Sequence, residues 1–112
     1  MSQIKGYASA LNTPDYRRLS IECKIDAFEN VFGIILNMAA TEEDWRDVYN
    51  EVFGGIIGET AKEIFSETDM EQPSYYDPDT TYKEDVMAWA EPVRRAFAEY
   101  AEGRRKVAAL IA

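Results

Sequence analysis

The sequence of 112 residues contains no histidine. This absence excludes the commonest general base of enzymes, the commonest zinc ligand and every catalytic dyad or triad that needs an imidazole. The single cysteine, Cys23, has no partner for an internal disulfide, and no histidine is present to activate its thiol as a nucleophile. We therefore expect a protein that is not an enzyme and that carries neither a cofactor nor a metal ion.

Long apolar stretches and alternating patterns are also missing. No run approaches the roughly 20 apolar residues that span a bilayer, and the first six residues lack the apolar core of a secretory signal. With the single cysteine, these features predict a cytoplasmic protein without membrane contact. No segment alternates apolar and polar residues with a period of two, so no β-strand is expected. A length of 112 residues and an apolar content of 46% fit one domain over residues 1–112.

Negative charge is concentrated in the middle of the chain, although the formal net charge of the whole is only −9. Residues 41–85 carry 14 carboxylates against three basic residues, a net charge of −11, whereas residues 86–112 carry a net charge of +2. Such a field repels phosphate groups and attracts basic surfaces, so it predicts a basic protein partner and no direct binding of nucleic acid. The alternative is that the charge only keeps the protein in solution.

The first long helical pattern follows a clear start signal. Thr13 has a hydroxyl that can cap a helix, and Pro14 suits the first helical position. Behind them, apolar residues recur in steps of four and three from Ile21 to Ala39. We therefore predict one helix over residues 15–39.

The second helical pattern begins with a capping box. Thr41 can accept a backbone N–H, and Asp44 can reach back to the start of the helix. The apolar pattern behind them is interrupted by the glycines of residues 54–58, because each glycine costs about 1 kcal/mol in a helix interior. We expect a break, a kink or a close helix contact there, and a further helical piece over residues 59–67.

The last third of the chain combines a loop and a third pattern. Residues 68–80 contain two prolines and several turn formers without periodicity, which predicts a loop. Thr81 opens another capping box, and the apolar seam behind it continues to Val107 and Ile111. Pro92 predicts a kink or a fresh helix start within this seam. The three patterns together predict an all-α fold, a small irregular bundle of four to five helices.

Carboxylates at helical spacing raise the question of a metal site. Asp26 and Glu29 form one such pair, with Glu22 one turn earlier, and Glu99 and Glu102 form another. Arginines separate the two pairs, and no further nucleotide-binding signature accompanies them. We interpret these side chains as solvated helix surface, since matches this loose are frequently false.

The candidate contact residues lie in the acidic middle of the chain. On the two helical patterns, carboxylates fall on the expected solvent side, and in the loop tyrosines alternate with carboxylates. Tyrosine supplies a large, rigid contact area with a polar tip, and carboxylates steer a basic partner and fix its register. The predicted partner-binding residues are Glu42, Glu43, Asp47, Glu51, Glu59, Glu63, Glu67, Tyr75, Tyr76, Asp77, Asp79 and Tyr82.

A small, acidic, cysteine-poor helical chain of this kind resembles the general class of phage- or mobile-element-encoded inhibitors, such as anti-restriction and anti-CRISPR proteins. This resemblance is one of class and covers no specific motif. It implies an inhibitor or regulator that binds a basic, nucleic-acid-binding protein, with carboxylates standing in for phosphates in the form that mimics DNA. The competing interpretation is an oligomeric structural or adaptor protein, such as a homodimer, in which the long apolar seams face another copy and the acidic face is merely solvated.

Overall fold

The computed structural model describes residues 3–73 and 80–111. The secondary structure of these residues is helical, with no strand among them, and the predicted all-α class is confirmed. The elements are α1 (Ile4–Ala8), the 3₁₀ helix η1 (Ser9–Asn12), α2 (Pro14–Arg17), α3 (Ile21–Met38), α4 (Glu42–Gly54), α5 (Ile56–Thr68) and α6 (Tyr82–Ile111).

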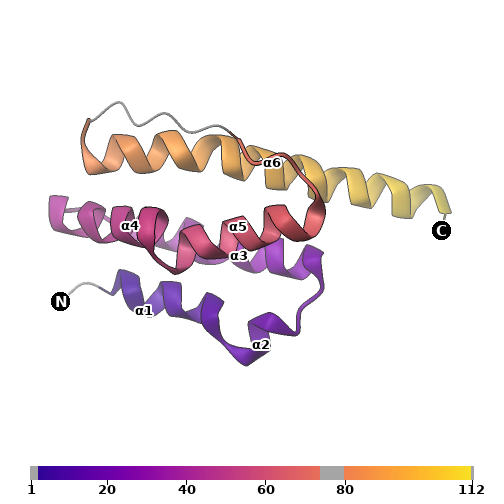
Figure 1. Cartoon of the computed structure of the whole chain (residues 1–112), viewed down its shortest axis with the longest axis horizontal. Coiled ribbons are helices and arrows are strands. Elements are labelled where there is room, and N and C mark those ends of the chain that lie inside the picture. The colour runs from indigo at the N-terminus through magenta and orange to yellow at the C-terminus, as the bar shows by residue number, and fades with distance from the viewer. Residues whose placement is uncertain (1–2, 74–79, 112) are drawn as a thin grey trace.

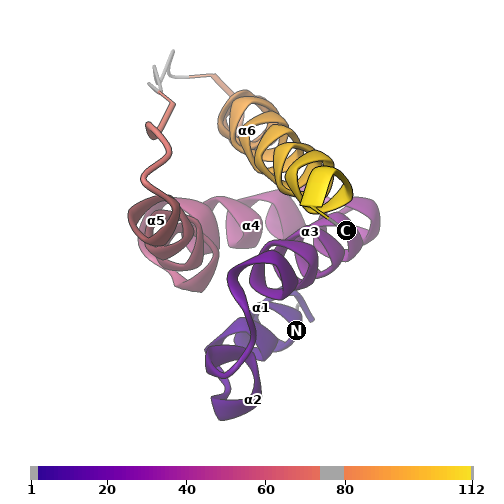
Figure 2. The ribbon, with the colours of Figure 1, turned by 90° about the vertical axis from the view of Figure 1, so that its right-hand side faces the viewer.

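The helices form an irregular bundle around α3 and α4. α6 runs along one side of the molecule, and α4 and α5 follow one another beneath it (Figure 1). α3 and α4 each pack against both α5 and α6. The short N-terminal helices lie on the side opposite α6, where α1 contacts α3 and α4 (Figure 2).

Aromatic rings join the long helices in the core. The ring of Phe97 in α6 lies edge-on to Phe28 of α3, 5.2 Å between centroids, and 4.9 Å from Phe65 of α5. Phe32 of α3 lies edge-on to Trp89 of α6 at 5.8 Å. These contacts confirm that the apolar seams predicted for three separate segments meet in one core, whose burial stabilises the bundle.

The predicted helix over residues 15–39 is wrong in its first part, because the chain forms two helices there. The capping by Thr13 is confirmed, since its Oγ1 accepts the backbone N–H of Tyr16 at 3.2 Å, but α2 ends after one turn at Arg17. Ser20 then begins α3, and its Oγ accepts the backbone N–H of Cys23 at 3.3 Å. A serine that satisfies the first amides of a helix favours a new start over continuation through an unbroken pattern.

Three glycines mark the junction between α4 and α5, where the structure confirms both a break and a close contact. Gly55 has an extended backbone and ends α4. α5 begins at Ile56 rather than at the predicted residue 59, so Gly58 lies inside this helix. A Cβ atom on Gly58 would lie 2.1 Å from the carbonyl oxygen of Val52, which only a glycine can accommodate. The contact therefore fixes how α5 turns away from α4.

α6 continues through Pro92, so the expected fresh start is not found. Proline has no N–H to donate to the carbonyl four residues earlier, here that of Ala88, but Ala88 is exposed and water can take the place of the missing donor. Towards its C-terminal end α6 extends beyond the other helices (Figure 1). Every residue from 102 to 110 is exposed, and Val107, predicted to continue the apolar seam, is 56% exposed. The seam continues in register, but none of the other helices within residues 3–73 and 80–111 covers it.

Candidate binding surface

Three glutamates form a row along α5. Glu59, Glu63 and Glu67 recur every fourth residue, which places them on one edge of the helix, and all three are exposed. We call them the acidic row. Glu67 pairs with Lys24 of α3, with Oε1 and Nζ 3.3 Å apart. Glu59 and Glu63 are exposed and form no ion pair within the described ranges, so no described basic side chain neutralises their charges.

The first two turns of α4 hold a second group of acids. Glu42 and Glu43 are exposed, whereas Asp47 is half-buried. Arg46 lies 3.7 Å from Glu43 and 3.9 Å from Asp47, so part of this negative charge is neutralised within the helix. Exposed pairs at these distances contribute little to stability.

Glu51 was predicted as a contact residue, but its side chain is directed to the α4–α5 junction. Its Oε2 atom accepts the backbone N–H of Ile56 at 3.2 Å, and the residue is half-buried. A carboxylate that satisfies the first amide of α5 also interacts favourably with the positive end of that helix. Helical spacing alone predicted that Glu51 lies on a solvent face. This spacing does not show the direction in which the chain turns at the glycines, and that turn brings the Glu51 carboxylate to the start of α5.

Tyr82, at the start of α6, joins the acids of α4. Glu42, Glu43, Arg46 and Tyr82 line one shallow groove of about 490 Å³. The ring of Tyr82 lies 5.2 Å from that of Tyr49, and the residue remains 37% exposed. The structure therefore brings three of the predicted contact residues together, Glu42, Glu43 and Tyr82.

The remaining predicted contacts are in the loop between α5 and α6. Tyr75, Tyr76, Asp77 and Asp79 lie outside the described residues. At the loop's beginning, Asp69 adopts a left-handed conformation with φ of 57°, which ends α5 one residue inside the predicted loop. At its end, the hydroxyl of Thr80 donates to the buried Asp85 at 2.7 Å and ties the loop to the first turn of α6.

The arginines that could neutralise the acidic middle of the chain are paired with α3 instead. The Nε atom of Arg94 donates to both carboxylate oxygens of Glu29, at 2.9 and 3.1 Å, and these hydrogen bonds raise the pKa of Arg94. Arg104 donates to Glu22 at 2.9 Å, which raises its pKa in the same way. Both pairs hold α6 against α3 and leave the acidic row without arginine partners from α6.

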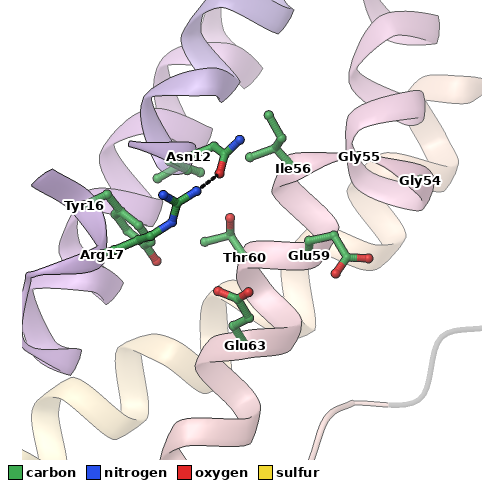
Figure 3. Close-up of a pocket in the computed structure, with 10 residues that line it drawn as sticks. Asn12, Tyr16, Arg17, Gly54, Gly55, Ile56, Glu59, Thr60 and Glu63 are labelled. Carbon is green, nitrogen blue, oxygen red and sulfur yellow. Dashed lines mark hydrogen bonds between the residues drawn. The ribbon is translucent and has the colours of Figure 1, made fainter. Parts of the chain in front are cut away.

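A polar cleft opens where η1 and α2 face the beginning of α5 (Figure 3). It has a volume of about 400 Å³. Arg17 and Asn12 stand on one wall, and Glu63 and Thr60 stand on the other. The guanidinium of Arg17 donates to the side-chain oxygen of Asn12. Two members of the acidic row, Glu59 and Glu63, thus border a cleft that no sequence pattern predicted.

The floor of the cleft contains a buried tyrosine. Tyr16 is 7% exposed, and its burial, followed by the charges of Glu63 and Glu67, raises its pKa to about 12. Lys24 lies over the ring, 5.9 Å from its centroid. At neutral pH the phenol is therefore protonated and able to donate a hydrogen bond.

No group of three or more cysteine, aspartate or glutamate side chains is arranged to hold a metal ion within residues 3–73 and 80–111. Among the helices described, none combines the length and apolar character required to cross a bilayer. Comparison of the chain with protein-family models, with curated proteins and with solved structures finds no match.

Proposed function

We propose that the protein is a non-enzymatic interaction module that binds a basic surface of another protein through the acidic row on α5. The observation that carries this proposal is the exposure of Glu59 and Glu63, which make no ion pair among the described residues. Residues 41–85 carry a net charge of −11, so the field around the row extends beyond its three side chains. Such a field raises the association rate of a basic partner and selects against acidic ones.

The finer form of this proposal is an inhibitor or regulator of a nucleic-acid-binding protein. Carboxylates one helical turn apart repeat at steps of about 6 Å, and they can stand in for phosphates along a cationic groove. An anti-restriction or anti-CRISPR inhibitor of phage origin would act in this way. Nucleic acid itself is not the expected ligand, because its phosphates are repelled by the same field.

The test compares two variants with equal changes of charge. The partner is captured from a cell extract at low salt, identified by mass spectrometry and purified for affinity measurements. The test variant neutralises the acidic row, and the control neutralises three exposed glutamates of α6. The substitutions are Glu59→Gln, Glu63→Gln and Glu67→Gln in the first, and Glu91→Gln, Glu99→Gln and Glu102→Gln in the second.

We expect the first variant to bind about tenfold or more weakly, and the control to bind nearly as well as the parent chain. The affinity of the parent chain falls steeply between about 0.01 M and 1 M salt, because the screening length falls from about 30 Å to about 3 Å. Equal losses in the two variants, or an affinity that salt does not change, would exclude the acidic row as the contact.

A second candidate function, an oligomeric structural or adaptor protein, is favoured by the end of α6. Val107 and Leu110 are 56% and 86% exposed on a helical segment that no other described residues cover. Short helices are marginal in water without such cover. A second copy that packs on this segment would give a homodimer. Light scattering over a range of concentrations tests it, and a monomer throughout would exclude it.

A further inference from the structure

The polar cleft holds opposite charges that do not pair with each other. Arg17 donates to the side-chain oxygen of Asn12 and forms no ion pair with any described carboxylate. The carboxylate of Glu63 points into the same cleft from α5, while that of Glu59 points away at the rim (Figure 3). Asn12 therefore orients the guanidinium, and both Arg17 and Glu63 remain available to a bound molecule.

Between these charges lies a hydroxyl without a partner. Thr60 is 4% exposed, its side chain lines the cleft, and its oxygen points toward Asn12 while its methyl group points toward Arg17 (Figure 3). The Thr60 hydroxyl makes no side-chain hydrogen bond to any of the described residues. Buried polar groups are nearly always hydrogen-bonded, because an unmade bond costs free energy. The hydroxyl can supply a hydrogen bond to a small polar ligand in the cleft.

We propose that this cleft binds a zwitterionic α-amino acid with an apolar side chain. The carboxylate of the ligand contacts the guanidinium of Arg17 and the hydroxyl of Thr60. Its ammonium group contacts the carboxylate of Glu63. Leu11 and Ile56 also line the cleft and offer an apolar border for the side chain. The volume of about 400 Å³ is in the lower part of the range of small-molecule sites.

The charges of the cleft disfavour ligands of a single sign. A simple amine would be attracted by Glu63 but repelled by Arg17. A simple carboxylate would be attracted by Arg17 but repelled by Glu63. Tyr16 adds no further negative charge, because a phenol is protonated at neutral pH and burial raises the pKa of Tyr16 further, to about 12. A molecule that carries both charges within one or two bonds of a shared carbon satisfies both walls at once.

The test uses three probes that differ in one group each. L-leucine carries both charges, 3-methylbutylamine lacks its carboxylate, and 4-methylpentanoate lacks its ammonium group. Titrations of the full chain, followed by NMR shifts of the backbone amides, give an affinity and a location for each probe. We expect saturable binding of L-leucine at concentrations of about 1 mM, with shifts at Asn12, Arg17 and Thr60, and about tenfold weaker binding of the other two.

Variants then separate this site from the proposed partner surface. Arg17→Gln removes the cation of the cleft without changing the acidic row, and we expect it to weaken L-leucine binding about tenfold while partner binding persists. Glu63→Gln should weaken L-leucine binding to a similar degree, whereas Arg105→Gln, on the exposed end of α6, should not. Thr60→Val removes the hydroxyl and retains the shape of the side chain; if it fails to fold, the two charge variants decide the question.

Several results would overturn the proposal. One is the absence of saturable binding of L-leucine to the folded chain. Another is equal affinity for L-leucine and either of its analogues, which would indicate a site for a single charge. Shifts confined to residues outside the cleft, or an affinity that neither Arg17→Gln nor Glu63→Gln changes, would likewise exclude it. None of these results bears on the binding of a basic protein.

Discussion

Gly58 lies so close to the backbone of Val52 that a Cβ atom at its position would come within 2.1 Å of the Val52 carbonyl oxygen. The contact joins the first turn of α5 to the last turn of α4, and backbone atoms cannot move aside as a flexible side chain can. It therefore provides a direct test of how the α4–α5 junction is built.

We expect Gly58→Ala to destabilise the fold by about 1–3 kcal/mol, the usual cost of overpacking. Gly33 is the matched control, because it lies inside α3 and a Cβ atom there meets nothing within 4 Å. Gly33→Ala should stabilise the protein by about 0.5–1 kcal/mol, as alanine loses less backbone freedom in a helix. Urea unfolding measures both, and a neutral Gly58→Ala would contradict the junction described.

The aromatic core leads to a second prediction. Phe97 is 1% exposed and contacts rings from α3 and α5, so Phe97→Ala should cost about 3–5 kcal/mol through lost contacts and a cavity. Phe53 is 36% exposed, and Phe53→Ala should lower the free energy of unfolding clearly less than Phe97→Ala does. Equal free energies of unfolding for the two variants would show that the core is misplaced.

The capping box of α4 predicts a dependence of stability on pH. Hydrogen bonds from the backbone N–H groups of Ala40 and Thr41 lower the pKa of Asp44 below its ordinary value. Because the folded-state pKa is the lower one, the contribution of Asp44 is complete above the unfolded pKa of about 3.9 and is lost as the pH falls through the folded value.

Asp44→Asn removes this charge and nearly keeps the shape of the side chain. The parent chain should be more stable than the variant at pH 6, and the difference should shrink as the pH falls below about 4. Thermal unfolding at a series of pH values measures it. A difference that grows on acidification would have the wrong sign for a carboxylate stabilised in the folded state.

The end of α6 allows a fourth prediction. Residues 102–110 are exposed, and the Arg104–Glu22 pair that reaches back to α3 is itself about half exposed. The free energy of unfolding of a monomer that stops after Ala101 should therefore differ from that of the full-length monomer by less than about 1 kcal/mol. If a second copy covers this segment, the same truncation also removes the dimer in light scattering. A large loss of stability in dilute monomer would contradict the exposure seen here.

The elements that could be predicted from the sequence are those whose causes are local. Thr41 and Asp44 stand three residues apart, and their capping box is present as expected. Ser20 also has a hydroxyl that caps a helix, and it begins α3. Its position directly before an unbroken apolar pattern, which we assigned to one longer helix, is the reason that this start was not predicted. Pro92 predicts a kink or a fresh helix start, and the structure excludes only the fresh start, because α6 runs through this residue as one helix.

The candidate site was only partly predictable for a different reason. The acidic row depends on helical spacing alone, and its exposure follows from the pattern. The cleft depends on two segments that are distant in the chain, residues 11–17 and 54–63, and Thr60 looks like any small residue on an apolar helix face. A hydroxyl at such a position, between Ile57 and Ile64, is the one signal that could have directed attention to it.

One wall of the cleft belongs to η1 and α2, which together span only Ser9–Arg17 and fold as two short turns. Helices of this length hold no structure by themselves, so this wall depends on docking against α3 and α5. Anything that bridges the two walls stabilises the docked arrangement over the detached one by mass action. The amides of this segment should consequently act as a built-in reporter, exchanging their hydrogens with solvent more slowly whenever the cleft is occupied.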